Sequence, residues 1–79
     1  MRDIQVLRSL ALGLVAIRTD GDDSLWDVGK LRKARKCADC EKQLAPGDQA
    51  YKPVTNKNYR YIRVCVPCVQ AGLRKVNGL

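Results

Sequence analysis

The 79-residue chain contains no histidine and no phenylalanine, and both absences restrict what it can do. Without histidine it cannot form a Ser-His-Asp or Cys-His catalytic centre, a His-ligated metal site or a nuclease site that depends on histidine. Without phenylalanine its aromatic residues are one tryptophan and three tyrosines. A chain of this length buries only about 60% of its unfolded surface. We therefore expect one small domain whose modest core needs a metal ion or disulfides for stability.

Long apolar runs are also absent. Residues 9–17 form an apolar stretch of nine residues, whereas a helix needs about 20 residues to span a bilayer. Acidic and glycine residues follow this stretch, in place of the small residues of a signal-peptide cleavage site. We therefore expect a cytoplasmic protein with no membrane partner, in which paired cysteines bind metal more often than they form disulfides.

Positive charge is concentrated in the second part of the chain. Residues 1–29 carry a net charge of −2, whereas residues 30–79 carry twelve basic and three acidic residues and a net charge of +9. One Zn²⁺ held by four thiolates would lower the latter value by two, to +7. A surplus of this kind favours polyanions such as nucleic acid, or acidic protein surfaces.

The N-terminal segment has two interpretations. Apolar residues recur at helical spacing in two rows over residues 3–18, which favours a helix that is mostly buried. Residues 12–17 are also typical of a strand, so the alternative is a pair of strands broken near Ser9 or Gly13. An acidic turn at residues 20–23 ends the segment in both cases.

A second helix is expected over residues 25–33. Ser24 and Asp27 fit a capping box, and apolar residues follow at helical spacing. The helix would continue into a basic stretch, which alternatively is an extended lead-in to the cysteines. The basic residues of this stretch are Lys30, Arg32, Lys33, Arg35 and Lys36.

Two strands and a third helix are expected after the basic stretch. Residues 49–54 and 59–64 are typical of strands and surround a polar turn, which predicts a hairpin. Pro67 suits the start of a helix, apolar residues follow at helical spacing, and Gly78 is suited to end it.

The four cysteines form two pairs, each with two residues between its members. This spacing lets one tight turn present both sulfurs to one ion, and two such turns complete the tetrahedral shell that Zn²⁺ prefers. Disulfides, a redox-active pair and an iron site are weaker alternatives. Four thiolates leave no position for water, so we predict one structural Zn²⁺, no enzymatic activity and no small-molecule substrate. The predicted ligands are Cys37, Cys40, Cys65 and Cys68.

The two cysteine pairs enclose a turn and the expected hairpin, and the second pair opens the expected helix. The residues in this pattern are Cys37, Cys40, Leu44, Pro46, Gly47, Asp48, Tyr51, Cys65 and Cys68. The pattern resembles that of a treble-clef zinc finger over residues 35–78. The resemblance implies that the first pair lies on a zinc knuckle and the second on the first turn of the C-terminal helix.

The resemblance and the N-terminal pattern together predict the fold class. We expect a small α+β domain stabilised by zinc, with a knuckle, a β-hairpin and a C-terminal helix, preceded by helical N-terminal segments. Residues 1–34 would pack on the four-cysteine zinc finger of residues 35–79 or on a partner.

Basic residues and tyrosines are the candidates for binding nucleic acid. Lysine and arginine neutralise phosphates, arginine also binds guanine edges, and tyrosine stacks on exposed bases. We therefore expect a DNA- or RNA-binding protein, such as a transcription regulator. The alternatives are that the charges form a solvated surface and that the tyrosines pack on Trp26 or the helix. The candidates are Arg32, Lys33, Arg35, Lys36, Lys57, Arg60 and Arg63 for nucleic acid, with Tyr59 and Tyr61 for stacking.

A protein-interaction adaptor or inhibitor is the second functional expectation. Residues 4–17 contain more apolar surface than a finger of this size can obviously cover. They would then form an interface with a partner protein or a homodimer, unless they cap the core of the finger.

Overall fold

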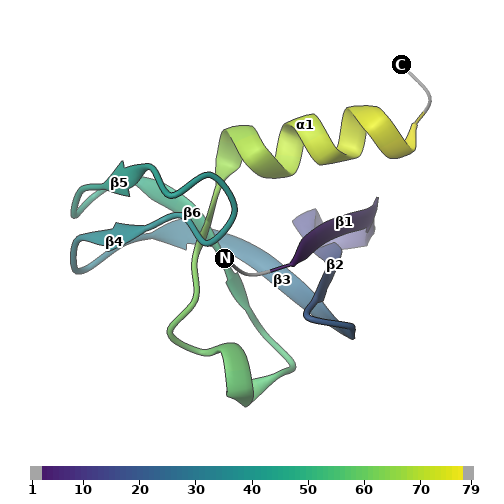
Figure 1. Ribbon diagram of the computed structural model, residues 1–79, viewed down its shortest axis with the longest axis horizontal. Coiled ribbons are helices and arrows are strands. Elements are labelled where there is room, and N and C mark those ends of the chain that lie inside the picture. The colour runs from purple at the N-terminus through teal and green to yellow at the C-terminus, as the bar shows by residue number, and fades with distance from the viewer. Residues whose placement is uncertain (1–2, 78–79) are drawn as a thin grey trace.

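The computed structural model describes residues 3–77 and is mostly β-structure. Five antiparallel strands form one sheet in the order β1-β2-β3-β6-β7, and two short strands, β4 and β5, form a separate hairpin. The large sheet curls into a half-barrel, and helix α1 lies across it at the C-terminal end of the chain (Figure 1). The elements are β1 (Ile4–Ser9), η1 (Ala11–Gly13), β2 (Val15–Thr19), β3 (Asp22–Lys30), β4 (Arg35–Lys36), β5 (Gln43–Leu44), β6 (Gln49–Pro53), η2 (Lys57–Tyr59), β7 (Val64–Cys65) and α1 (Val66–Val76).

The expected α+β treble-clef layout with helical N-terminal segments is wrong, because the N-terminal third forms strands β1, β2 and β3. Alternate residues of β2 are buried, namely Val15, Ile17 and Thr19. This period of two is that of a strand with one face toward the core. The alternative interpretation, two strands broken near Ser9 or Gly13, is confirmed, and η1 forms the break.

The helix expected over residues 25–33 is also wrong, and the capping box does not form. Ser24 and Trp26 are buried on the inner face of β3. The hydroxyl of Ser24 accepts a hydrogen bond of 2.8 Å from the indole Nε1 of Trp26, which satisfies the polar atom of the largest core side chain. The expected acidic turn is present: Asp20 and Gly21 have φ values of 50° and 90°, as the tight hairpin between β2 and β3 requires.

The C-terminal part is closer to the prediction. Strand β6 and helix α1 lie where they were expected, although Gly78, the expected helix stop, lies outside the described residues. The strand expected over residues 59–64 is wrong except at its end, because only Val64 and Cys65 pair with β6. Before them the chain forms η2. Its N-cap residue, Asn56, accepts a 3.0 Å side-chain hydrogen bond from the amide of Asn58.

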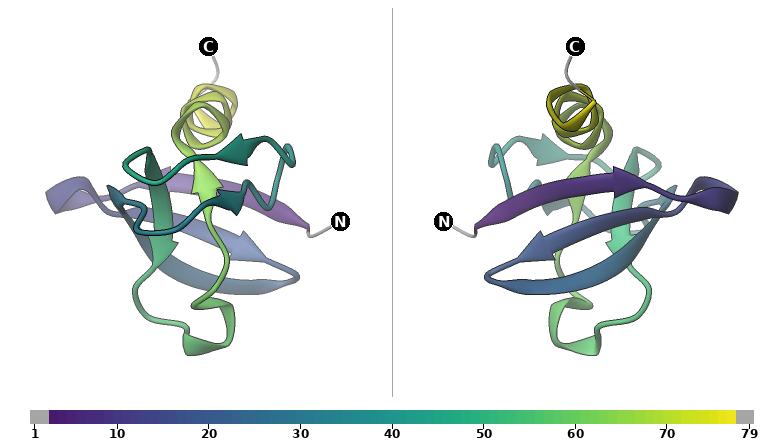
Figure 2. Two further views of the ribbon diagram at one scale, coloured as in Figure 1. Left: turned by 90° about the vertical axis from the view of Figure 1, so that its left-hand side faces the viewer. Right: turned by 90° about the vertical axis from the view of Figure 1, so that its right-hand side faces the viewer.

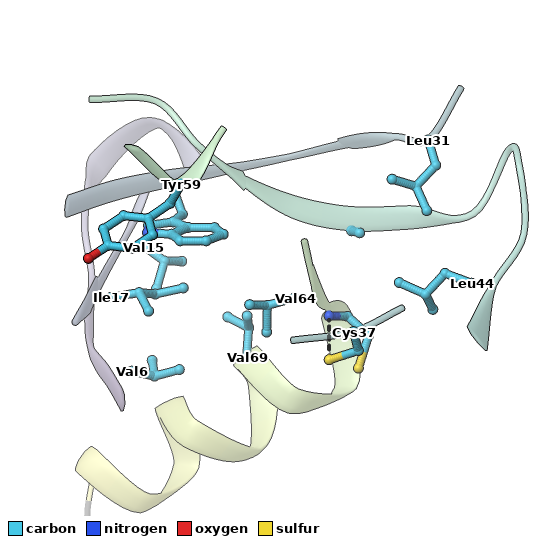
Figure 3. Packing of buried hydrophobic residues seen from close by; sticks show 12 residues of the cluster. Val6, Val15, Ile17, Leu31, Cys37, Leu44, Tyr59, Val64 and Val69 are labelled. Atoms are coloured by element: carbon cyan, nitrogen blue, oxygen red, sulfur yellow. Dashed lines mark hydrogen bonds between the residues drawn. The ribbon is translucent and has the colours of Figure 1, made fainter. Parts of the chain in front are cut away.

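One core connects the N-terminal strands with the cysteine-containing part of the chain. Strand β3 pairs with β6 along five residues, so residues on both sides of position 34 share one sheet. Val64 and Val69 lie in the middle of the core, between one end that contains Ile17 and another that contains Leu31 and Cys37 (Figure 3). No helix in the described chain is long and apolar enough to cross a membrane.

Helix α1 packs closely on the edge strand β1. A Cβ atom added to Gly72 would lie 2.6 Å from both Cβ and Cγ2 of Val6. Only a glycine allows the helix and strand to approach this closely. In the end-on view of the helix, the strands of the sheet curve beneath it (Figure 2). The helix therefore closes one side of the half-barrel, and its N-terminal end carries two of the four cysteines.

Candidate metal centre and basic hollow

The four cysteine sulfurs meet in one cluster, although they come from two segments of the chain. All four Sγ atoms lie within 4.8 Å of one another. The pairs Cys37–Cys68 and Cys40–Cys65 are each separated by 3.8 Å between sulfurs. These separations exceed the roughly 2.05 Å of a disulfide bond, and all four cysteines are free.

This geometry fits a tetrahedral zinc site. Four sulfurs at about 2.3 Å from a central Zn²⁺ are separated from one another by about 3.8 Å. Both sulfur pairs have this separation, so an ion can bind with little movement of the side chains. The coarse prediction of a four-cysteine metal site is therefore supported by the structure, in the residues that the spacing indicated.

The first cysteine pair lies on a tight turn. The amide of Cys37 donates to the carbonyl of Lys42, and the amide of Glu41 donates to the carbonyl of Cys37, both at 2.9 Å. Glu41 has a φ of 64°, so the turn uses a left-handed residue directly after Cys40. The amide of Ala38 donates to the carbonyl of Arg63 at 2.8 Å, which attaches this turn to the chain before the second pair.

The second pair is positioned by the start of helix α1. Cys65 is the N-cap residue and Cys68 lies in the first turn, three residues later. Pro67 occupies one of the first helical positions, where its missing amide hydrogen costs nothing. The positive end of the helix dipole points toward the sulfurs and favours their thiolate form.

Three backbone amides donate to the sulfur of Cys37. They belong to Cys65, Asp39 and Cys40, at 3.3, 3.4 and 3.5 Å. Burial raises the pKa of the Cys37 thiol, but the amide hydrogen bonds outweigh burial and lower this pKa to about 7. The hydrogen bonds from the three amides therefore favour the thiolate form of Cys37.

The thiols of Cys65 and Cys68 resist ionisation on their own. Burial raises the pKa of Cys65. Burial, hydrogen bonds with neighbouring thiols and the negative charge of Cys37 raise the pKa of Cys68. Several thiolates in such a small volume repel one another, and a divalent cation is the group that offsets this repulsion. The donor set and its charge thus fit Zn²⁺, which would crosslink the two segments.

A second feature lies beside the metal centre, a hollow of about 320 Å³ on the sheet. Its walls include six basic side chains and no carboxylate. Gly29 and Ala50, which pair with each other between β3 and β6, also line it, and their small size leaves the space open. We call this feature the basic hollow, and its cations are Lys30, Arg32, Lys33, Arg35, Lys52 and Arg63.

The basic hollow contains four of the seven residues predicted to bind nucleic acid, namely Arg32, Lys33, Arg35 and Arg63. Lys36, Lys57 and Arg60 are exposed but do not line it. Sequence reasoning missed Lys52 because β3, whose pairing with β6 brings Lys52 to the hollow, was expected to be a helix. Lys30 belongs to the basic stretch, and that charge run was the only sequence signal for it.

Two of the arginines are held in place by backbone carbonyls. Arg35 donates to the carbonyl of Tyr61 at 3.1 Å. Arg63 donates to the carbonyls of Arg60 and Ile62 at 2.7 and 2.9 Å. Burial and the positive charge of Arg35 both lower the pKa of Arg63, as expected where like charges converge.

The two candidate stacking tyrosines have opposite environments. Tyr59 is only 8% exposed, and its hydroxyl donates a 2.7 Å hydrogen bond to Asp22, so its ring belongs to the core. Tyr61 is 67% exposed. The guanidinium carbons of Arg60 and Arg35 lie 4.8 and 6.0 Å from the centroid of the Tyr61 ring.

The apolar N-terminal segment divides between core and surface. Val6, Val15 and Ile17 are buried, as expected if the segment caps the core. Other leucines remain accessible: Leu7 and Leu10 line a second hollow of about 540 Å³. Leu12 in η1 is 94% exposed, with a φ of 66°.

Comparisons with known proteins give no relative. No family model, curated protein or solved structure matches the chain. The resemblance to treble-clef fingers therefore has no support beyond the cysteine cluster itself.

Proposed function

We propose that this chain is a non-enzymatic zinc protein that binds nucleic acid through the basic hollow. The metal holds the fold together, and the cations of the hollow bind phosphate groups. The observation that carries the proposal is the convergence of six basic side chains around one hollow without a carboxylate among them.

The charge distribution supports a polyanionic ligand. Among residues 3–77 the one salt bridge joins Arg18 to Asp23, and neither residue lines the basic hollow. Converging cations repel one another, so their free energy falls when an anion binds between them. Lys36 and Arg60 extend the positive charge along the chain beyond the hollow, which favours a polymer of phosphates over a single small anion.

The test uses two variants with equal net charge. One replaces Lys30, Arg32, Lys33 and Lys52 with glutamine; within the described chain these side chains make no hydrogen bond or ion pair, so the fold should tolerate the change. The matched control replaces four basic residues elsewhere with glutamine, namely Arg8, Lys42, Arg74 and Lys75.

Binding to a labelled 20-nucleotide strand and to its duplex is measured by fluorescence anisotropy across a salt series. Each phosphate contact contributes about 0.7–0.9 to the slope of log K against log salt. We expect the hollow variant to lose about three units of slope and most of its affinity, and the control to change little. Wild-type protein that binds neither strand at low salt contradicts the proposal, as does a control that loses as much as the hollow variant. Zinc content is measured in every sample.

The second candidate function is a protein-interaction adaptor or inhibitor. Its specific support is Leu12, an exposed leucine in a left-handed conformation that costs about 1–2 kcal/mol for a side chain of this kind. Leu10, two residues before Leu12, lines the second hollow together with Leu7 and Leu25. Sedimentation of wild type and a Leu10→Ser, Leu12→Ser variant tests for a homodimer. Association that persists in high salt and is lost in the variant favours this candidate.

A further inference from the structure

Tyr61 is the one strongly exposed aromatic ring in the described chain. Trp26 is fully buried, Tyr59 is 8% exposed and Tyr51 is half-buried, whereas Tyr61 is 67% exposed. Tyr61 also lies apart from any strand or helix, in the turn between η2 and β7. An exposed ring in this place contributes little to the core, and most of the side chain is accessible to a ligand.

The turn that carries Tyr61 is fixed by backbone hydrogen bonds. The amide of Arg60 donates to the carbonyl of Lys57 at 3.3 Å, and the amide of Ile62 donates to the carbonyl of Tyr59 at 2.9 Å. The buried ring of Tyr59 attaches the same turn to the core. The ring of Tyr61 therefore projects from a rigid support.

Arg35 connects Tyr61 with the basic hollow. Its guanidinium lines the hollow, donates to the carbonyl of Tyr61 at 3.1 Å, and lies 6.0 Å from the centroid of the tyrosine ring. Arg60 approaches the ring more closely, at 4.8 Å. Guanidinium groups at such distances attract the ring through cation–π interaction and can themselves stack on bases. One surface thus presents an aromatic ring, planar cations and a phosphate-binding hollow side by side.

We infer that the protein binds single-stranded nucleic acid in preference to duplex, with a base stacked on Tyr61 and the adjacent backbone phosphates in the basic hollow. This inference rests on the proposed function. In a duplex the faces of the bases are covered by their neighbours, so a protein reaches only base edges and phosphates. In a single strand a base face is accessible, and stacking on an aromatic side chain tolerates any base. Phosphate contacts alone would favour the duplex, whose charge density is higher, so a preference for the single strand depends on the ring.

The experiment compares three proteins on the 20-nucleotide strand and on the blunt duplex made from it. Tyr61→Leu keeps an apolar side chain without a ring, and Tyr61→Phe keeps the ring without the hydroxyl. Loss of one stacked base weakens binding by about 5- to 150-fold. We expect this loss for Tyr61→Leu with the single strand only, unchanged duplex affinity, and near wild-type binding by Tyr61→Phe. Because Tyr61 is largely exposed, both variants should fold, which thermal unfolding checks.

The outcomes separate this inference from the proposed function. If wild type binds both forms equally and Tyr61→Leu changes neither affinity, the inference is wrong and the proposed function stands. A Tyr61→Leu variant that weakens both forms equally also overturns the inference, because the ring then only positions the neighbouring arginines. If wild type binds neither form at low salt, both statements are wrong.

Discussion

Removal of the metal should unfold the whole domain rather than the cysteine turns alone. Strands β4 and β5 have two residues each, and they carry Cys37 at one end, so a hairpin this short is not stable by itself. Helix α1 has 11 residues and begins at the second cysteine pair, and isolated helices of this length are marginal in water. Both elements supply residues to the single core, among them Val69 and Leu44.

The expected loss of stability follows from a comparison of two free energies. Structural Zn²⁺ contributes about 10–16 kcal/mol to the folding of small domains, whereas the net stability of a whole domain is about 5–15 kcal/mol. For a chain of 79 residues the net stability is about 4–12 kcal/mol, so the loss of the ion is comparable with the entire stability. The core is small as well, because its fully buried large side chains are Trp26, Ile17 and three valines. We expect no folded state to remain after chelation.

Trp26 provides the assay. It is the only tryptophan, it is fully buried, and its Nε1 is bonded to Ser24, so its fluorescence should shift to the red when the sheet opens. Chelator is titrated while tryptophan emission and the amide spectrum are followed, with metal content fixed first at one Zn²⁺ per chain. Cys37→Ser and Cys68→Ser should unfold without chelator, and Gln70→Ala, an exposed change in the same helix, should not. A dispersed amide spectrum with buried Trp26 after exhaustive chelation would refute this reasoning.

Three further substitutions test the packing, each by denaturant unfolding of the zinc-loaded protein. Thr19→Val should stabilise it by about 1–2 kcal/mol, because the buried hydroxyl has no hydrogen-bond partner in the described chain; a destabilised variant would indicate a hidden partner. Gly72→Ala should destabilise it by about 1–2 kcal/mol, since overpacking against Val6 outweighs the better helix propensity of alanine, and an unchanged midpoint would contradict this. Glu41→Gly should raise stability by about 0.5–1 kcal/mol by relieving a left-handed φ of 64°, and a lowered midpoint would contradict this.

The metal centre could be predicted from the sequence because the spacing within each cysteine pair is a local feature of the chain. Two residues between cysteines define a turn that presents both sulfurs, whatever the rest of the chain does. The start of helix α1 was equally local, since Pro67 marks it. The four cysteines of the cluster are therefore those that were predicted, although the elements around them differ from the prediction.

The N-terminal strands were mistaken for helices because their alternation is interrupted. The pairing of β1 with β2 shifts register between Val6 and Arg8, and this bulge changes which residues face the core. Leu10 and Leu14 contribute to the apparent helical rows, although both lie outside the strands. Regular alternation survives in β2, but that strand has only five residues, too few to outweigh a helical pattern three times longer. The fold class was wrong for this reason, and the error concealed the pairing that brings Lys52 to the basic hollow.

The two sites are connected through the backbone, which gives the metal a role in the proposed binding. Arg35 and Arg63 each precede a zinc-ligand candidate by two residues, Cys37 and Cys65 respectively. A parallel bridge joins Cys37 to Arg63, so a metal that crosslinks the two segments also sets the separation of the two arginines. Holding like charges together costs free energy, and burial together with the positive charge of Arg35 lowers the pKa of Arg63. In the proposed function, a metal ion at the four cysteines would therefore support the converging positive charges to which phosphate groups bind.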